Sequence, residues 1–531
     1  MSFLPGEKLH YAETHFKFKL PWSLLYRPWP EILADAPFQF IPGTEPTLWI
    51  VIRDAHRFPT ILEKADIHIR RKTVGKKANN VVYKIINKTL DIRVCKQFEF
   101  IPLDMGELAP GHYEIDCHFT AQRYDIATGN AIGKRKTFSR WNLPGLKPAP
   151  LHIQVLKEDP PKAPGFAAGE MHCHTYYSCD HVEHGATPAV MQQAAKSVGL
   201  DFVSLTDHAY DFAYTEEDYT QEALSPAPRF QALREEVEAL PSYPLMLAGE
   251  EVSAGNGKGE NVHMTVLAPD GYIPGLGDCG RNWLENKPTL KIEQVLEQTA
   301  AHCFAAHPFQ QMGLLEKFVF RRGYWESKDL HTDKTHAIRG LQFWNGIRDE
   351  GFRLGREFWI NELGKGNFIL PIGGNDAHGD MNDTTAVHLP LFSLKHSRDH
   401  VFGKVRTVVK VDSTDVGAPL SEESLNRSFL GSNCYITDGP ALWWEKAEKQ
   451  VVFHARSSSD FGGGFRYIRI FGRRILAGGK ASPREELCIE SQVASREIAD
   501  IPVISAGYTY LRAECETASG KFALTSAVPL V

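Results

Sequence analysis

The chain has 531 residues, far more than a typical single domain, so its length predicts two to four domains. Apolar residues make up 43% and charged residues 23%, a composition that excludes a disordered or collagen-like protein. The formal net charge is −6, from 59 Lys and Arg against 65 Asp and Glu. Because nucleic acids are bound through clustered Lys and Arg, and no such cluster stands out, we expect no nucleic-acid partner.

The sequence predicts neither a membrane segment nor a disulfide framework. Its longest apolar runs, at 47–52 and 368–372, are far shorter than the roughly 20 residues that a membrane-spanning helix needs. The N-terminus lacks the basic start and apolar stretch of a signal peptide. The nine cysteines are scattered without CxxC spacing, so we expect a reduced, cytoplasmic protein.

Residues 1–160 have the pattern of a β domain. Short β-branched or aromatic stretches occur at 47–53, 65–70, 81–86, 95–101 and 114–119. Turn residues separate them, and Tyr113 follows Pro110 and Gly111, which is typical of a tyrosine whose hydroxyl ties back to the preceding loop of a sandwich. We therefore predict an N-terminal β-sandwich-like domain over 1–160.

A proline-rich stretch at 157–165 precedes a different pattern, in which strands and helices alternate. The predicted strands are 169–175, 201–206, 244–252, 261–268, 303–306, 341–344 and 368–373. One helix is predicted to start at Thr187 as N-cap with Pro188 in its first turn, and to end at Gly199. Alternation indicates a mainly parallel sheet, and seven strands are enough to close a barrel, which we predict over 166–425.

From 430 to the end the chain returns to a β pattern. Strands are predicted at 451–455, 467–471 and 508–514, with a glycine turn at 462–464. The sequence therefore predicts a small C-terminal β domain over 430–531. The expected fold class is a (βα) barrel flanked by two β-sandwich-like domains.

Histidines and carboxylates stand at or near the ends of successive strands of the predicted barrel. They are His172, His174, Asp207, His208, Glu251, His263, His307, Asp376 and His378. Because the carboxyl ends of barrel strands meet at one rim, we expect these side chains to converge. A single histidine at a strand end is usually structural, but six strand ends in succession favour a metal centre. Such ligands suit Zn, Mn or Fe, and the lack of clustered Cys argues against a structural zinc or iron–sulfur site.

The ordered series HxHT, TDH, GxE, H, HP and DxH over about 168–410 resembles the polymerase-and-histidinol-phosphatase (PHP) superfamily of metal-dependent hydrolases. That resemblance implies a distorted seven-stranded (βα) barrel as the catalytic domain. The layout is also similar to the carbaryl-hydrolase-like branch, in which a β domain precedes the barrel. There a segment like the Thr-Asp-Gly-Pro at 437–440 leads into a C-terminal β domain.

The resemblance also implies a centre of two or three divalent metal ions. One ion would be held by His172, His174, Glu251 and Asp376. The second would be held by the bridging Glu251 with His263 and His307. The third would be held by Asp180, His208 and His378.

Two positions in these motifs need a choice between neighbours. Members of the family commonly carry the first carboxylate directly after a serine, where this chain has Cys179 followed by Asp180. We prefer Asp180, because a carboxylate suits such a site better than a lone thiolate. In the third motif the family pattern places the ligand before Val-Ser, which selects Glu251, and Glu250 would then point to the opposite face.

The implied chemistry is hydrolysis, in which a water shared by two cations loses a proton near neutral pH and attacks the substrate. Asp207, His208 and His378 are the candidates for moving protons, and the sequence does not rank them. The candidates for substrate contacts are Asn345, Arg406, Arg321 and Arg322.

A phosphoesterase acting on a small phosphorylated molecule is the favoured hypothesis, because closely spaced cations suit an anion with several oxygens. An ester, carbamate or amide hydrolase on the same centre is the alternative, since the aromatic loop at 318–325 suits a neutral aryl substrate. A non-catalytic binding protein is less favoured because the ligand set is complete. An exonuclease is less favoured because of the net charge of −6.

Overall fold

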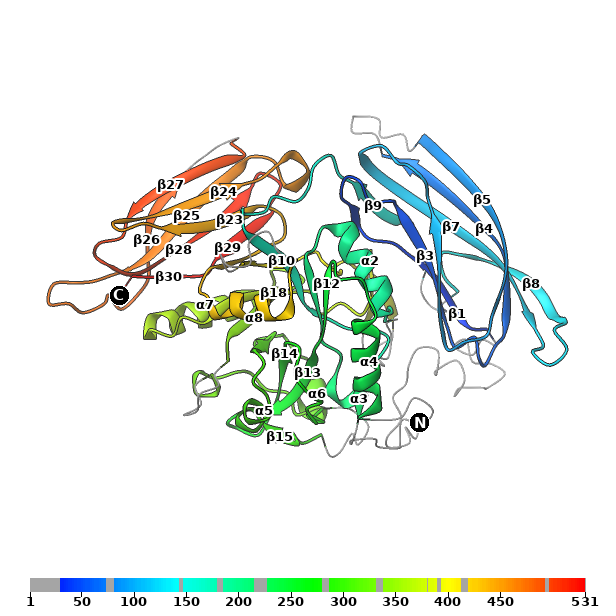
Figure 1. Cartoon of the computed structure of the whole chain (residues 1–531), viewed down its shortest axis with the longest axis horizontal. Coiled ribbons are helices and arrows are strands. Elements are labelled where there is room, and N and C mark those ends of the chain that lie inside the picture. Colours follow the sequence, from blue (N-terminus) through cyan, green and yellow to red (C-terminus); the bar gives the residue numbers. More distant parts are fainter. Residues whose placement is uncertain are drawn as a thin grey trace.

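The structure is a computed structural model that describes residues 29–72, 81–142, 147–178, 185–213, 227–278, 286–330, 338–379, 381–388, 393–411, 419–491 and 496–530. Figure 1 shows three parts of the chain. Blue N-terminal sheets and an orange-to-red C-terminal β part flank a green and yellow central part, which holds the helices. The central part therefore lies between the N-terminal and the C-terminal β parts.

Two sheets form the N-terminal part. The first has the order β1 (Glu31–Asp35), β3 (Thr47–Arg53), β6 (Phe98–Asp104). The second has the order β2 (Gln39–Phe40), β9 (Leu151–Val155), β7 (Gly111–Tyr124), β4 (Thr60–Arg71), β5 (Val81–Val94), and β8 (Ala131–Ser139) pairs with β7.

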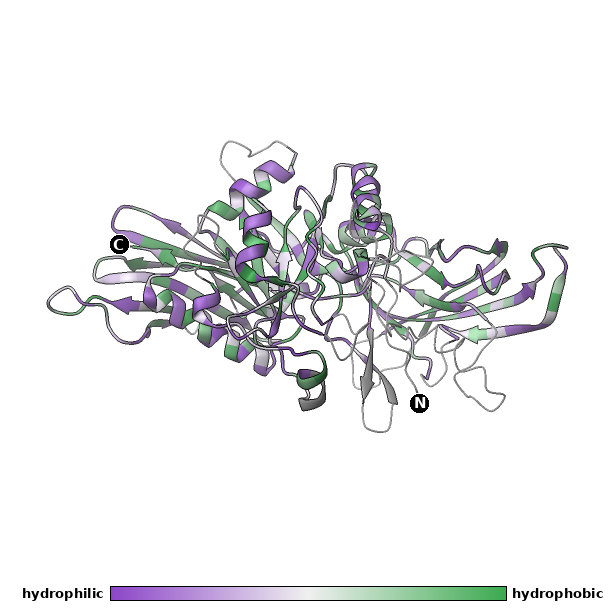
Figure 2. Ribbon diagram, turned by 90° about the horizontal axis from the view of Figure 1, so that it is seen from below, coloured by the Kyte–Doolittle hydropathy of each residue, from purple (hydrophilic) through white to green (hydrophobic). Residues whose placement is uncertain are grey.

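The N-terminal sheets share one hydrophobic core because their strands alternate in polarity. Along β7, Ile115, Cys117 and Phe119 are buried while the residues between them are partly exposed. Successive side chains of a strand point to opposite faces, so one face of each sheet packs inward. Figure 2 shows this mixture of hydrophobic and hydrophilic residues along the strands. The Tyr113 hydroxyl donates to the Ala109 carbonyl at 2.5 Å, which confirms the predicted tie to the preceding loop.

The central part is built on two further sheets. One begins with β12 (Leu245–Ala248), β11 (Phe202–Leu205), β10 (Phe166–Cys173) and β21 (Arg406–Lys410). The other has the order β15 (Leu290–Lys291), β13 (Glu250–Gly255), β14 (Asn261–Val266), β16 (Cys303–Ala306), β17 (Gly340–Asn345), β18 (Leu370–Gly374). A separate hairpin pairs β19 (Thr384–His388) with β20 (Ser393–Ser397).

The predicted seven-stranded (βα) barrel is wrong. The strands expected to close it lie in two separate sheets, and β14 is antiparallel to both β13 and β16. Only residues 256–260 join β13 to β14, and a parallel crossover needs a dozen residues or more. The single strand predicted at 244–252 is also divided at Gly249 into β12 and β13, which belong to different sheets. The molecule is predominantly β and not a barrel of alternating strands and helices.

The helices among the described residues lie mainly in the central part. They are α2 (Pro188–Val198), α3 (Ala209–Phe212), α4 (Pro228–Glu238), α5 (Ile292–Gln298), α6 (Leu314–Val319), α7 (Glu350–Lys365) and α8 (Glu422–Leu430), with short 3-10 turns η1 (Ser327–Asp329) and η2 (Ser459–Phe461). The predicted ends of α2 are confirmed: the Thr187 side chain accepts from the Val190 N–H, and Gly199 ends the helix at φ 78°. No helix in the described ranges is long and apolar enough to cross a membrane.

The large central sheet continues into the C-terminal part. After β21 it runs through β22 (Cys434–Thr437), β29 (Phe522–Thr525), β28 (Tyr508–Thr517), β25 (Phe465–Arg474) and β26 (Glu486–Ser491), and β30 (Val528–Pro529) pairs with β28. A three-stranded sheet of β23 (Ala441–Lys446), β24 (Gln450–Arg456) and β27 (Ile498–Ile504) shares a core with it. Hydrogen-bonded strands therefore connect the central and C-terminal parts.

A buried ion pair joins the N-terminal part to the central part. One guanidinium nitrogen of Arg140 lies 3.0 Å from Asp383 Oδ2, and a second contacts the other carboxylate oxygen. Their side chains are 4% and 11% exposed, so the pair is largely out of water. Burial raises the pKa of Asp383, but hydrogen bonding to His396 and the charge of Arg140 outweigh it and lower the pKa to about 2.

We expect Arg140→Ala to lower the free energy of unfolding by about 3 kcal/mol, because it leaves the largely buried carboxylate of Asp383 without its guanidinium partner. The stabilisation that comes from the lowered pKa of Asp383 should be present above pH about 4 and should be lost as the pH falls toward 2. Urea unfolding at pH 7 and at acid pH measures both effects. Arg135→Ala breaks an exposed pair with Glu63 and should cost at most about 1 kcal/mol. Equal losses of unfolding free energy in Arg140→Ala and Arg135→Ala would contradict a stabilising role for the buried pair of Arg140 and Asp383.

Candidate metal centre

The predicted site residues converge where the two central sheets meet. His172 lies near the end of β10 and His174 follows that strand, while Asp376 and His378 follow β18. Isolated parallel bridges link Cys173 to Ala377 and His208 to Glu251, so the sheets touch at two points beside the site. The structure thus brings eight of the predicted residues together without a closed barrel. They are His172, His174, His208, Glu251, His263, His307, Asp376 and His378.

Glu251 is the centre of this cluster. Its Oε1 lies 2.8 Å from His263 Nδ1, 3.0 Å from His307 Nε2 and 3.3 Å from His172 Nε2. Its Oε2 lies 2.8 Å from His208 Nδ1 and 3.6 Å from His174 Nε2. The carboxylate is 1% exposed, and although burial raises its pKa, the charges of His263 and His172 hold that pKa well below its usual value. Glu251 is therefore a charged group that five imidazoles approach.

The donor atoms form two groups in which all atoms lie within 4.8 Å of one another. The first group contains His172, Glu251, His307 and Asp376, and the second contains His174, His208 and His378. This grouping differs from the implied one, because His307 joins the first group and His174 joins the second. His172 Nε2 and His174 Nε2 are 3.2 Å apart, and Asp376 Oδ1 lies 3.1 Å from the latter, so the two groups adjoin.

The hydrogen bonds of three imidazoles orient their lone pairs toward the cluster. His172 Nδ1 lies 2.7 Å from Gln342 Oε1, which accepts, so in the neutral ring it is Nε2 that carries the lone pair. His378 Nδ1 likewise faces the Asp376 carbonyl at 3.2 Å. The Ser178 hydroxyl donates to Asp207, so His174 Nδ1 donates to Ser178 Oγ at 3.1 Å. Neutral imidazoles held by a neighbour through one nitrogen and open at the other are the state that binds metal.

Burial favours the neutral form of two imidazoles of the cluster, His174 and His307, whereas at His172 the charges of Glu251 and Asp376 outweigh burial and raise the pKa. Burial lowers the pKa of His174 to about 3, and the positive charges of His378 and His208 act in the same direction. Burial also lowers the pKa of His307. Neutral nitrogen donors beside the charged carboxylates of Glu251 and Asp376 are the donor set that Zn, Mn or Fe prefers, so the residues present fit a transition metal.

Backbone strain accompanies this site. His307 has φ 26° and Asp376 has φ 53°, values in the left-handed region that non-glycine residues rarely adopt. Each costs of the order of 1–3 kcal/mol and persists only where the surroundings enforce it. Such strain is typical of a functional site.

Asp278 is a site residue that the sequence analysis missed. Its Oδ2 lies 2.9 Å from His263 Nε2 and 2.6 Å from Arg322 Nε, and the Ser253 hydroxyl donates to Oδ1 at 2.5 Å. Asp278 therefore holds the nitrogen of His263 that faces away from Glu251 and so fixes the imidazole that contacts Glu251. Asp278 follows no predicted strand end, and its only signal in the sequence is a carboxylate in a glycine-rich turn.

Asp207 has a scaffolding role in the structure. It is buried and accepts from the backbone N–H and hydroxyl of Thr175 and of Ser178, at 2.7–3.0 Å. These four bonds shape the loop after β10 and, through Ser178, orient His174. Three residues were predicted to move protons. His208 and His378 contribute atoms to the donor groups, and Asp207 does not.

Two buried glutamates lie off the cluster. Glu250 accepts from the Ile273 N–H at 3.1 and 3.2 Å, so it points away from Glu251 as predicted, and burial raises its pKa well above the usual value. Glu170 accepts from the backbone of His172 and Asn375, and burial raises its pKa to about 7. Both stabilise the strands that carry the donor residues.

The four predicted substrate contacts lie in different places. Asn345 donates to Asp376 Oδ2 at 3.1 Å, so it belongs to the cluster. Arg322 contacts Asp278, which in turn contacts His263, so Arg322 reaches the cluster only through Asp278. Arg321 is exposed and lines a separate open cavity near the β13–β14 turn. Arg406 is buried and lines another cavity, away from the donor residues.

Cys179 and Asp180 lie outside the described residues, so the choice of Asp180 as the metal ligand remains a prediction. We expect Asp180→Ala to lower metal content, or kcat by about 100-fold or more, because it removes a ligand. Cys179→Ala should leave both nearly unchanged. Metal analysis and kinetics of the two purified variants decide between them, and the reverse ranking would identify Cys179 as the ligand.

Comparisons with known proteins do not assign this chain to a family. No protein-family model matches the chain, and no curated protein sequence matches it. A β-D-mannosidase structure from Dictyoglomus thermophilum is 9% identical with a TM-score of 0.21, and the alignment covers 94% of this chain and 66% of that one. A β-glucuronidase from Bacteroides uniformis is 9% identical with a TM-score of 0.18, covering 94% and 60%. This chain spans less than two thirds of the length of both, and TM-scores this low establish no common fold.

Proposed function

We propose that the protein is a metal-dependent hydrolase of the PHP type. The observation that carries the proposal is the pair of adjoining donor groups around Glu251, with imidazole lone pairs turned toward them by Gln342, Ser178 and a backbone carbonyl. The order of the motifs along the chain supports the relationship to that superfamily, while the barrel that usually accompanies it forms no part of the proposal.

His172, Glu251, His307 and Asp376 would hold one ion, and His174, His208 and His378 would hold a second. Bound ions would polarise the scissile group and lower the pKa of a nearby water. Glu251 lies between the groups and would set their separation. Asn345 steadies Asp376 and presents its amide beside it, where it would orient a substrate oxygen.

Hydrolysis of a phosphoester is the proposed reaction, because two adjoining cations suit a group with several oxygens that spread charge between them. Ester or carbamate hydrolysis is the second candidate, and the position of Arg322 favours it. Asp278 already engages that guanidinium, so Arg322 is less able to neutralise a substrate phosphate.

The test has two parts. Elemental analysis of desalted protein should find close to two or three equivalents of Zn, Mn or Fe, and a chelator should abolish hydrolysis. Aryl phosphates should then be turned over with a higher kcat/KM than aryl acetates or N-methylcarbamates, and inorganic phosphate should compete. Metal-free protein with chelator-insensitive activity would contradict the metal centre. Faster carbamate turnover without competition by phosphate would select the second candidate.

A further inference from the structure

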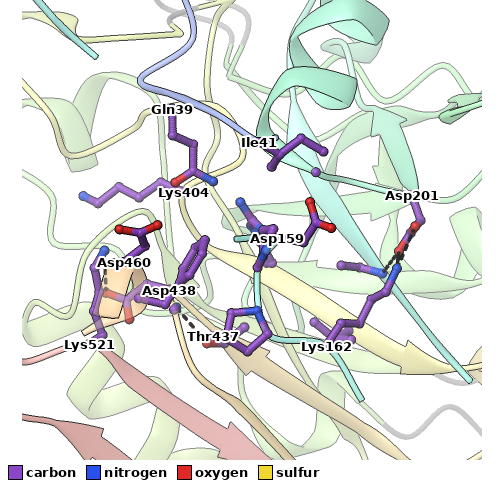
Figure 3. Close-up of a pocket in the computed structure, with 18 of the residues that line it drawn as sticks. Gln39, Ile41, Asp159, Lys162, Asp201, Lys404, Thr437, Asp438, Asp460 and Lys521 are labelled. Carbon is purple, nitrogen blue, oxygen red and sulfur yellow. Dashed lines mark hydrogen bonds and ion pairs between the residues drawn. The ribbon is translucent and has the colours of Figure 1, made fainter. Parts of the chain in front are cut away.

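A cavity of about 350 Å³ lies where the N-terminal, central and C-terminal parts of the chain meet. Gln39 comes from the N-terminal part, Asp159 from the connecting segment, Arg406 from β21 and Lys521 from the C-terminal part. Figure 3 shows Asp438, Asp460 and Lys521 grouped on one side, Lys162 and Asp201 on the other, and Asp159 between them. Its volume is in the range of small-molecule sites, and none of the eight clustered residues lines it.

The buried guanidinium of Arg406 is the feature of this cavity that indicates a ligand. Arg406 is 6% exposed, and within the described part of the chain its hydrogen bonds reach two backbone carbonyls, those of Gly403 at 3.1 Å and Val198 at 2.7 Å. Among the described residues, no carboxylate lies within ion-pair distance of its guanidinium. Burial lowers the pKa of Arg406 to about 10, which reflects the cost of a desolvated cation. An anion in the cavity would offset that cost.

Asp201 also lines the cavity, but its carboxylate already has other partners. Asp201 contacts Lys162 Nζ through both oxygens, at 2.9 and 2.8 Å, and also accepts from the Ala168 N–H at 2.7 Å. Positive charge also accumulates on another wall: burial and the neighbouring Lys521 lower the pKa of Lys404. Lys521 Nζ lies 4.0 Å from Asp438, at the limit of an ion pair. Lys162 and Lys521 thus have carboxylate partners in the cavity, whereas Arg406 and Lys404 have none within ion-pair distance among the described residues.

The acidic residues restrict the ligand further. Asp159, Asp438 and Asp460 also line the cavity. Asp460 Oδ2 accepts from the Lys157 N–H and Asp438 Oδ1 from the Phe522 N–H, each at 2.7 Å. Carboxylates accept hydrogen bonds and repel a doubly charged phosphate. We propose that the cavity binds a small carboxylic acid that also carries an ammonium or hydroxyl group, with its carboxylate on Arg406.

Isothermal titration with four probes at constant ionic strength tests this site. The probes are L-serine, glycerate, propanoate, which lacks the donors, and inorganic phosphate. We expect L-serine or glycerate to bind with a Kd near or below about 1 mM, more tightly than propanoate or phosphate. Arg406→Gln should weaken that binding about 10- to 100-fold, because it removes a charge-assisted bond. Arg474→Gln, which changes an exposed arginine elsewhere, should have no effect.

Lys521→Gln provides a second variant if Arg406→Gln fails to fold, since its side chain is 38% exposed. It should weaken binding by a smaller factor and leave thermal stability unchanged. The proposal is overturned if neither L-serine nor glycerate binds, if phosphate binds most tightly, or if the folded variants bind like the wild type. Glu251→Gln should retain the binding that depends on Arg406, so failure of the metal centre and failure of this cavity are distinguishable.

Discussion

Glu251→Gln is expected to abolish hydrolysis and most metal binding. The substitution keeps the size of the side chain but removes the charge that five imidazoles approach within 3.6 Å. Loss of groups that merely orient ligands costs about 10- to 100-fold, so removal of the shared carboxylate should lower kcat/KM by more than about 100-fold. Metal content by elemental analysis and kcat/KM on the best substrate measure the effect.

Glu250→Gln is a matched control one residue away. Glu250 is also buried, but it accepts from the Ile273 N–H on the opposite face, and burial raises its pKa well above the usual value, which favours the protonated form. The Gln amide keeps an oxygen that can accept from the Ile273 N–H and lies off the donor cluster, so metal content and activity should remain near wild type. Similar losses in both variants would mean that the strand, and not the centre, was damaged.

Asp278→Ala should lower metal affinity and kcat/KM by about 10- to 100-fold, the range found for groups that orient metal ligands, because Asp278 acts through His263 on the ligand Glu251. The structural reason is that His263 loses the 2.9 Å contact that holds Nε2 and directs Nδ1 to Glu251. Competition with a chromophoric chelator gives the metal affinity. Thermal unfolding of the metal-free variant should change much less than the affinity, which separates orientation of His263 from a general loss of structure.

Arg322→Gln removes the guanidinium partner of Asp278 while leaving its contacts with His263 and Ser253 in place. It should therefore cost less metal affinity than Asp278→Ala. If Arg322→Gln costs more kcat/KM at unchanged metal affinity, Arg322 acts on the substrate and not through Asp278.

The sequence predicted the local elements well because their signals are local. The cap at Thr187 and the stop at Gly199 bound α2 as expected. The strand that contains His172 and the strands that precede His307 and Asp376 form close to the predicted positions. The pairing of strands failed because it depends on connections: the short turn after Gly255 makes β14 antiparallel. Asp278 was missed since its role arises only when a turn folds over His263. The cavity position of Arg406 likewise depends on three distant segments.

The continuity of the large sheet bears on how this protein could be divided. β21 hydrogen-bonds to β10 on one side and to β22 on the other, although β22 lies beyond α8. A fragment that stopped at residue 430 would leave the outer edge of β21, with the buried Val408 and Val409, without its neighbour. Unprotected edges of this kind recruit strands from other molecules. Such a fragment should aggregate during expression, whereas the full chain should stay monodisperse.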